Sequence, residues 1–247
     1  MSGARALAAA GVAAGGLATL AHAGPAVTWL PPVRRRVAPA WHGLGRPGHV
    51  ALTFDDGPDP TSTPAFLAAL DGLGWRATFF MLGSMAERSP GLAGEVAAAG
   101  HEIALHGHEH RNQLARTPAG VAADLARGLD AVASASGHQP VWHRPPYGVV
   151  SGPGWRAARE LGLRIVLWSA WGRDWRARAM PASVVADVEA GLTPGATILL
   201  HDSDCTSAPG AWRSALGALP LLAERLVARG WDVGPLAEHG VGSRSPR

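Results

Sequence analysis

Cysteine and lysine are almost missing from this sequence. Cys205 is the one cysteine among 247 residues, which excludes an internal disulfide and any zinc site built from several cysteines. Lysine is absent, so all 22 basic residues are arginine, and they are scattered apart from residues 34–36. The net charge is only +3. Such a diffuse and nearly balanced charge does not favour a nucleic-acid partner, and we expect none.

Charged residues are also scarce, at 17%, whereas 47% of the residues are hydrophobic. This composition excludes a chain that is disordered along its whole length, because it supplies enough apolar surface for a large core. The chain is long enough for one α/β domain of roughly 200 residues. We therefore expect a single folded domain.

The first 24 residues, MSGARALAAAGVAAGGLATLAHAG, differ from the rest of the chain. One arginine precedes an uncharged run of alanine, glycine and leucine, and Ala-His-Ala then has the form of a signal-peptide cleavage site. This pattern favours a secreted or cell-envelope protein over a cytoplasmic one. Two alternatives stay open. Residues 6–32 also fit a poor membrane anchor with its positive flank at residues 34–36, and a low-complexity tail is the third option.

Short apolar runs alternate with longer stretches of 3.6-residue period from residue 46 onward. The helical stretches begin at Pro64 and at Pro118, and another covers residues 216–226. This alternation predicts parallel strands, and hence a doubly wound sheet or a barrel. Seven runs predict strands, at residues 49–54, 76–81, 101–105, 140–143, 164–168, 196–200 and 231–233. The expected organisation is an N-terminal signal or anchor-like segment and linker (1–45), a folded domain (46–240) and a C-terminal tail (241–247).

Polar side chains follow most of the predicted strands, where the loops of a parallel α/β fold converge. One such residue means little, because surface loops gather polar side chains anyway. Five of the seven strands end in carboxylate, imidazole or guanidinium groups, which indicates a site. These groups belong to Asp55, Asp56, His106, His110, Arg144, Asp174, His201 and Asp202.

His106 and His110 are four residues apart, a spacing that can point two imidazoles at one metal ion. The spacing alone is weak evidence in a chain with 11 histidines. A carboxylate on a neighbouring strand strengthens it, because two histidines and one carboxylate leave open positions on zinc, as in catalytic sites. If Asp56 is that ligand, the adjacent Asp55 is a free base, and the charge of the cation offsets the repulsion between them. An Asp-Gly-Pro turn without a metal accounts more easily for one aspartate than for two.

Five motifs resemble those of the polysaccharide deacetylases, also called carbohydrate esterase family four or the NodB homology domain. They are TFDDGP (53–58), HGHEH (106–110), RPPYG (144–148), RDW (173–175) and LLHD (199–202), in the order of that family. The resemblance implies a distorted (β/α) barrel of about seven parallel strands in a single domain. It also implies that residues 46–240 are a catalytic domain that removes acetyl groups from N-acetylated sugars in peptidoglycan, chitin or a related glycan.

The resemblance further implies a divalent metal ion, usually Zn²⁺ and sometimes Co²⁺ or another ion, bound by Asp56, His106 and His110. Such a metal makes water a usable nucleophile near neutral pH. Asp55 would then take a proton from the attacking water. His201 would give a proton to the leaving amine, which an amide needs before its bond can break.

Other residues at matching positions would support these steps. Arg144 would pair with the base and keep it ionised, and Asp174 would orient the acid and raise its basicity. The backbone N–H of Tyr147 would stabilise the tetrahedral oxyanion together with the metal. Substrate contacts are expected from Tyr147, Trp175 and Leu199, whereas most of the other tryptophans are expected in the core.

Two positions depart from the family pattern. Gly107 replaces a Ser or Thr, so we expect the loss of a loop hydrogen bond, and Trp171 replaces an Asp, which we expect to alter the shape of the pocket. Two other functions stay open: a non-catalytic cell-wall glycan-binding protein, and a deacetylase or amidohydrolase of a small N-acetyl compound. Asp55 and His201 speak against the first, because binding alone needs neither of them.

Overall fold

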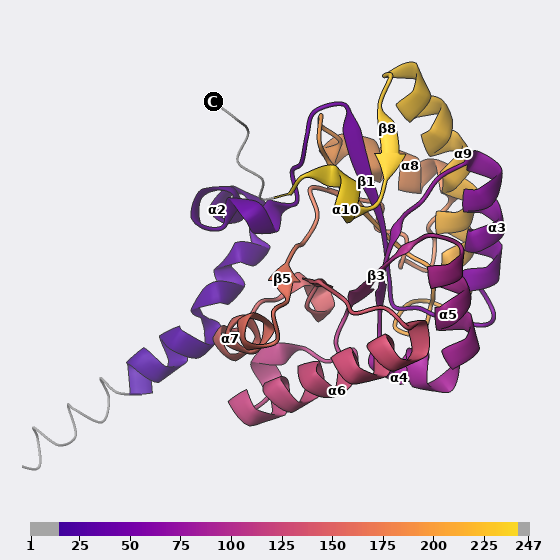
Figure 1. Cartoon of the computed structure of the whole chain (residues 1–247). Coiled ribbons are helices and arrows are strands. Elements are labelled where there is room, and N and C mark those ends of the chain that lie inside the picture. The colour runs from indigo at the N-terminus through magenta and orange to yellow at the C-terminus, as the bar shows by residue number, and fades with distance from the viewer. Residues whose placement is uncertain (1–14, 242–247) are drawn as a thin grey trace, which may run out of the picture.

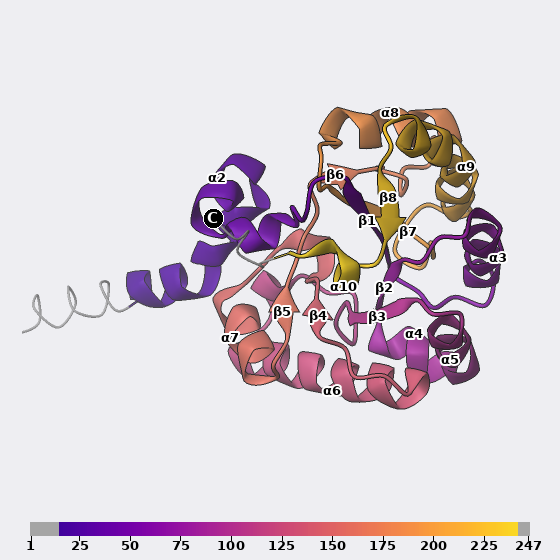
Figure 2. The ribbon, with the colours of Figure 1, turned by 45° about the horizontal axis from the view of Figure 1, so that its top comes forward.

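The computed structural model describes residues 15–241. Eight strands form one sheet that curls into a distorted barrel, and helices cover its outside (Figures 1 and 2). All pairs are parallel, in the order β5-β4-β3-β2-β1-β7-β6, and β8 also pairs with β1. The expected distorted barrel is therefore confirmed. The strands are β1 (His49–Asp55), β2 (Thr78–Met81), β3 (Glu102–Leu105), β4 (Trp142–His143), β5 (Arg164–Ile165), β6 (Ala170–Trp171), β7 (Thr197–His201) and β8 (Asp232–Gly234).

The helices begin and end at residues that suit those positions. The longest described barrel helix, α6, begins at Pro118, where Thr117 caps it by accepting a hydrogen bond from Gly120 N–H, and ends at Ser136, before Gly137 with a positive φ of 72°. The three helices expected from periodicity, α3, α6 and α9, are all present. The barrel helices are α3 (Thr63–Leu73), α4 (Gly83–Arg88), α5 (Pro90–Ala98), α6 (Pro118–Ser136), α7 (Gly152–Glu160), α8 (Pro181–Gly191), α9 (Trp212–Ala228) and α10 (Leu236–His239), with 3₁₀ helices η3 (Gln113–Ala115) and η4 (Pro146–Gly148).

The described structure contains one strand more than the seven predicted. The apolar run at residues 164–168 pairs with β4 only at Arg164 and Ile165, and Ala170 and Trp171 then pair with β7 as β6. A strand of two residues has too few side chains for a recognisable alternation. This is why the predicted strand at residues 164–168 was longer than β5 and why β6 was not predicted.

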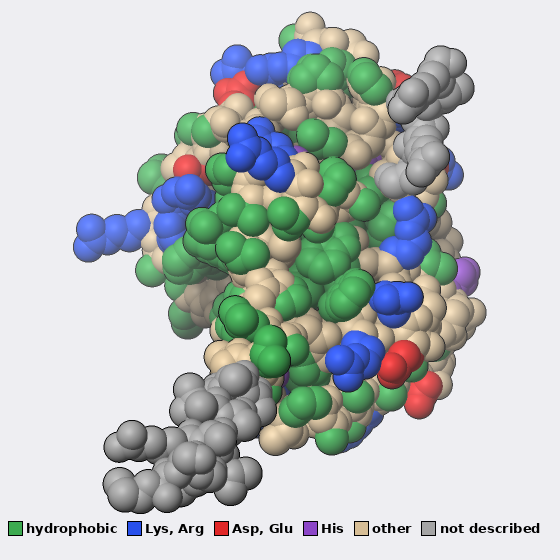
Figure 3. Space-filling view, turned by 90° about the vertical axis from the view of Figure 1, so that its left-hand side faces the viewer, with side chains coloured by type: hydrophobic (Ala, Val, Ile, Leu, Met, Phe, Trp, Pro, Cys, Tyr) green, Lys and Arg blue, Asp and Glu red, His purple; other side chains and the backbone are tan. Residues whose placement is uncertain are grey.

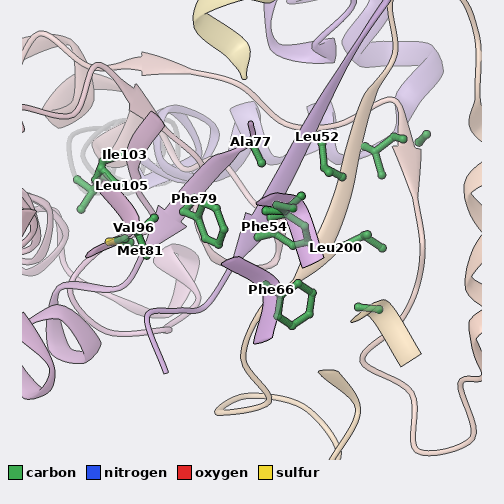
Figure 4. Packing of buried hydrophobic residues seen from close by; sticks show 14 of the residues in the cluster. Leu52, Phe54, Phe66, Ala77, Phe79, Met81, Val96, Ile103, Leu105 and Leu200 are labelled. Atoms are coloured by element: carbon green, nitrogen blue, oxygen red, sulfur yellow. The ribbon is translucent and has the colours of Figure 1, made fainter. Parts of the chain in front are cut away.

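Strand β1 forms the centre of the sheet and carries the core. It pairs with β7 along one edge, and with β8 and then β2 along the other. All seven of its residues are buried. Phe54 packs against Phe66 and Phe79 with ring centroids 5.1 Å from each, in a cluster that also contains Leu52 and Leu200 (Figure 4). The end of β1 is therefore rigidly held, and Asp55 is its last residue.

A segment that precedes the barrel packs against it beside β5 and α7 (Figures 1 and 2). It comprises η1 (Gly24–Trp29), α2 (Pro31–Val37) and η2 (Pro39–His42). β5 and β6 are not paired with each other, and the end of this segment bonds to the chain that connects them and to β7. The N–H of Leu167 donates to the carbonyl of Trp41 (2.9 Å), and the hydroxyl of Thr197 donates to that of Gly43. The assignment of residues 1–45 to a leader, an anchor or a tail stays a prediction.

Candidate active site

Several of the polar residues after the strands converge at the carboxyl ends of the parallel sheet. Asp55 ends β1 and Asp56 follows it, His106 follows β3, Arg144 follows β4, and His201 ends β7. In the register of the sheet, Asp55 lies beside His201, because β1 and β7 are neighbours. The topology thus brings together side chains that are up to 146 positions apart in the sequence, from 55 to 201.

Asp56, His106 and His110 form a compact group of potential metal ligands. Their ligand atoms all lie within 4.8 Å of one another, and within residues 15–241 no second group of this kind occurs. Asp56 Oδ1 lies 3.4 Å from His106 Nε2 and 3.6 Å from His110 Nε2. All three side chains are largely buried, so the group of potential ligands is enclosed by the protein and is not a solvated surface cluster.

The hydrogen bonds around this group suit a cation. Asp56 Oδ1 is buried without a hydrogen-bond partner, an arrangement that is costly unless something else satisfies the oxygen. His106 Nδ1 lies 2.7 Å from the carbonyl of Arg144 and donates to it, which leaves Nε2 with a lone pair. Burial, and to a lesser degree the neighbouring His110, hold the pKa of His106 well below its usual range, and burial also lowers that of His110. Neutral imidazoles with a free Nε2 are the form that binds metal, so the residues fit a divalent ion.

Asp55 forms a buried ion pair instead of joining the ligand group. Its Oδ1 accepts a hydrogen bond of 2.6 Å from Arg144 Nη1, and its Oδ2 lies 3.8 Å from His106 Nε2. Burial raises the pKa of Asp55 to about 6, against the opposing effects of Arg144 and His201. Arg144 is fully buried and also donates to the hydroxyl of Thr53, which fixes the guanidinium in place. This carboxylate is therefore mostly ionised at neutral pH, beside the candidate metal ligands.

His201, beside Asp55 in the sheet, is held by Asp174. Its Nδ1 lies 3.0 Å from Asp174 Oδ1, and its backbone N–H donates to Oδ2 of the same residue at 2.8 Å. Burial alone would lower the pKa of His201, but the charge and the hydrogen bond of Asp174 raise it to about 10. The imidazole is therefore protonated at neutral pH, and its Nε2 is the end that is left for a substrate.

A cavity of about 390 Å³ opens onto these groups. Tyr147, Trp175 and Leu199, the three residues expected to contact substrate, all line it. Trp171 lines it as well, and its ring stacks on that of Trp175 with centroids 6.4 Å apart, so the departure at this position does shape the pocket. The remaining lining residues are Trp29, Asp55, His106, His110, Gly148, Trp168, His201, Thr206 and Ser207.

Comparisons with known proteins agree with this geometry. Residues 43–166 match the family model described as polysaccharide deacetylase. The chain belongs to the polysaccharide deacetylase family. It is 37% identical over 159 residues to a peptidoglycan-N-acetylglucosamine deacetylase of Listeria monocytogenes. The matched stretch covers 64% of this chain but only 33% of that protein. The chain therefore spans about a third of the length of that relative.

Two shorter proteins are matched over most of their length. A chitooligosaccharide deacetylase from a Bradyrhizobium strain is 35% identical over 197 residues, which covers 76% of this chain and 89% of that one. The solved structure of a family 4 carbohydrate esterase from Streptomyces lividans in complex with acetate has a TM-score of 0.68 and 32% identity, and the match covers 76% of this chain and 92% of that one. This deacetylase-family chain thus shares its fold with the solved esterase.

Backbone strain in this deacetylase-family chain is concentrated at the site. The three non-glycine residues of the described structure with positive φ are Asp56 (81°), Tyr147 (60°) and Arg173 (49°). One is a candidate ligand, one lines the cavity, and one precedes Asp174. Side chains disfavour this region by about 1–3 kcal/mol each, so the surrounding structure must hold these residues there.

The loop with the two histidines is held by a residue that sequence reasoning missed. Asp124, on α6, accepts hydrogen bonds from the backbone N–H of His108 (3.1 Å) and of Glu109 (3.3 Å). Gly107 has a φ of 100°, and a Cβ built there would lie 3.2 Å from Asp124 Oδ2. We expected Gly107 to cost the loop a hydrogen bond. In the structure, two hydrogen bonds to Asp124 on α6 hold this loop. A single aspartate on an amphipathic helix gives no signal of such a role.

Thr206 was missed as well. Its hydroxyl donates to Asp56 Oδ2 at 2.6 Å, so that one oxygen of the carboxylate is occupied and Oδ1 is left toward the histidines. Thr206 lies in an irregular stretch between β7 and α9, where no periodicity assigns a direction to any side chain. Only its position shortly after the LLHD motif could have pointed to it.

Proposed function

We propose that this protein is a metal-dependent hydrolase that removes acetyl groups from N-acetylated sugars of a glycan such as peptidoglycan or chitin. The observation that carries the proposal is that one buried group of candidate metal ligands shares a cavity edge with two different ion pairs, Asp55–Arg144 and His201–Asp174. The names of the relatives, deacetylases of peptidoglycan and of chitooligosaccharides, support the same substrate class.

Asp56, His106 and His110 would hold the metal ion. We propose Zn²⁺, because two imidazoles and one carboxylate are a common zinc ligand set, with Co²⁺ or another divalent ion as the alternative. When bound, such an ion polarises a carbonyl and can lower the pKa of water from about 15.7 to about 7. The remaining chemistry falls to the side chains around it.

Asp55 would accept the proton of the attacking water, since it is held by Arg144 and is not needed as a ligand. A base in this role contributes about 100- to 10,000-fold to the rate. His201 would protonate the leaving amine, for which a protonated imidazole is required. At neutral pH Asp55, paired with Arg144, is ready to accept a proton, and His201, paired with Asp174, is ready to donate one. These two states match the two proton transfers of amide hydrolysis.

Substrate orientation would come from the residues of the cavity. The backbone N–H of Tyr147 would donate to the oxyanion, and Leu199 would contact the acetyl methyl group. Trp175 is 44% exposed and offers a ring for stacking on a sugar. The cavity volume, about 390 Å³, is at the lower end of the range for small-ligand pockets, about 300–1,000 Å³. This size also supports a second candidate, a deacetylase of a small N-acetyl compound.

We also propose that the protein works outside the cytoplasm or in the cell envelope, where such glycans are found. Within residues 15–241 no helix is long and apolar enough to cross a membrane. Several apolar side chains of residues 15–37 are nevertheless exposed, on the side of the molecule that Figure 3 shows, where hydrophobic side chains gather. They support an association of the N-terminal segment with a membrane surface.

Acetate release tests these proposals. The protein is stripped of metal with a chelator, reloaded with Zn²⁺ or Co²⁺, and supplied with chitin oligomers, peptidoglycan or small N-acetyl compounds. Release that depends on metal and occurs with the polymers supports the leading proposal, and release only from small compounds supports the second candidate. If the protein binds glycan but releases no acetate with metal supplied, both proposals are wrong and the protein is a glycan-binding protein.

A further inference from the structure

Trp29 belongs to η1, ahead of the barrel, yet it lines the same cavity as the candidate catalytic residues. It precedes residues 43–166, the part that matches the family model, so the family motifs assign it no role. Its side chain is 48% exposed. A large aromatic ring left half open at the rim of a polar site is a surface suited to a ligand with its own apolar face.

A buried arginine fixes the position of Trp29 relative to the barrel. Arg34 Nη1 donates to the carbonyls of Thr28 (2.9 Å) and Trp29 (3.3 Å), and Nη2 donates to the carbonyl of Trp168 (2.8 Å). Trp168 lines the cavity too, so one guanidinium joins two of its aromatic walls.

The charge of Arg34 makes this connection hard to break. The residue is 2% exposed, and within residues 15–241 no carboxylate forms an ion pair with it. Burial, with a smaller effect of Arg144, lowers the pKa of Arg34 to about 10, so it stays cationic at neutral pH. Backbone carbonyls and the neutral ring of His42, at 3.3 Å from Nε, are its acceptors. If η1 moved away, a buried cation would lose its partners, which is strongly unfavourable.

We propose that Trp29 is a substrate-binding residue and that η1 supplies one wall of the sugar subsite beside the metal ligands. The inference rests on the proposed deacetylase function. The indole would lie against the apolar face of a pyranose ring, while the hydroxyl groups at the ring edge reach solvent or the polar residues opposite. The N-terminal segment would then be part of the substrate-binding unit and not only a linker.

The test compares Trp29→Leu, which keeps an apolar side chain but loses the ring, with Trp29→Phe, which keeps a ring. The control is Val27→Ala, on the same 3₁₀ helix and equally exposed at 48%, but not part of the cavity wall. With a chitooligosaccharide as substrate, we expect Trp29→Leu to raise KM about fivefold to tenfold with kcat within about twofold. Trp29→Phe and Val27→Ala are expected to stay within about twofold of the wild type in both constants.

An unchanged KM in Trp29→Leu, in a protein whose wild type releases acetate, would overturn the inference and leave the proposed function intact. If the wild type releases none, the proposed function fails, and calorimetric titration with the same oligosaccharide decides the inference separately. Weaker binding by Trp29→Leu alone supports it; equal binding, or no binding by the wild type, overturns it. Trp29→Gln replaces Trp29→Leu if thermal melting shows that the latter is unfolded.

Discussion

The carboxylate of Asp55 and the guanidinium of Arg144 form an ion pair of 2.6 Å in which both side chains are almost inaccessible to solvent. The next residue along the chain, Asp56, has no such cation and instead turns one oxygen toward two imidazoles. Two adjacent aspartates thus have different environments, and the second of them has a positive φ of 81°. The two roles that we propose, a base at Asp55 and a ligand at Asp56, can therefore be tested one at a time.

Replacement of the base should remove turnover but not the metal. We expect Asp55→Asn to lower kcat by about 100- to 10,000-fold, because the amide is a poor proton acceptor, while the bound metal stays near one ion per chain. Acetate release and elemental analysis of the dialysed protein measure the two effects. Asp71→Asn, on the exposed side of α3, is the matched control and should change neither. Near-normal rates in Asp55→Asn would refute the assignment of the base.

Loss of a ligand should remove the metal as well as the activity. In His106→Ala the ligand group keeps one imidazole and one carboxylate, so we expect the metal to be lost on dialysis and activity with it. Elemental analysis with and without added Zn²⁺ measures this, and His138→Ala, at an exposed position, is the control. Full metal content in His106→Ala would show that the ion binds elsewhere.

Thr206→Val should weaken the metal site without removing any ligand. The substitution deletes the hydroxyl that bonds to Asp56 Oδ2, which leaves the carboxylate free to rotate. Residues that orient a ligand typically change metal affinity by about 10- to 100-fold. Competition with a fluorescent zinc chelator measures the dissociation constant, and Thr61→Val, which is exposed, provides the control. An unchanged dissociation constant would show that Asp56 needs no such support.

Acid should destabilise the fold through His101. Burial, together with the charge of Arg76, lowers the pKa of His101 to about 4, and Nδ1 accepts a hydrogen bond from the N–H of Ala77. The unfolded chain, with a pKa near 6.5, binds more protons between these values, so the free energy of unfolding falls as the pH drops from about 6.5 to 4.

The contribution of His101 is on the order of 2 kcal/mol between pH 7.5 and pH 5. Urea denaturation at the two pH values measures it, and His101→Asn, whose side-chain oxygen can accept the same bond, should show a smaller loss of stability on acidification than the wild type. Exposed His138→Asn should behave as the wild type does. Equal losses in the wild type and His101→Asn would contradict the prediction.

Residues at strand ends were accessible to prediction from the sequence because apolar runs mark the strands and parallel strands gather their carboxyl ends. Asp55, His106 and His201 were found in this way. Thr206 and Asp124 were not, because their roles arise from contacts with Asp56 and with the histidine loop that no local pattern encodes. Trp29 was missed for a further reason: its segment has the composition of a leader and linker, and only the three-dimensional packing places it at the cavity.

The gap between β5 and β6 limits how much of the amino-terminal region can be dispensed with. A shortened chain that starts at residue 46 would deprive the buried amide of Leu167 and the buried hydroxyl of Thr197 of their acceptors on Trp41 and Gly43. Each such loss costs about 1–3 kcal/mol unless water replaces the acceptor. A peptidase cut after Ala23 would keep both bonds. A chain that starts at residue 46 would lose both of them and leave β5 and β6 without the segment that packs beside them.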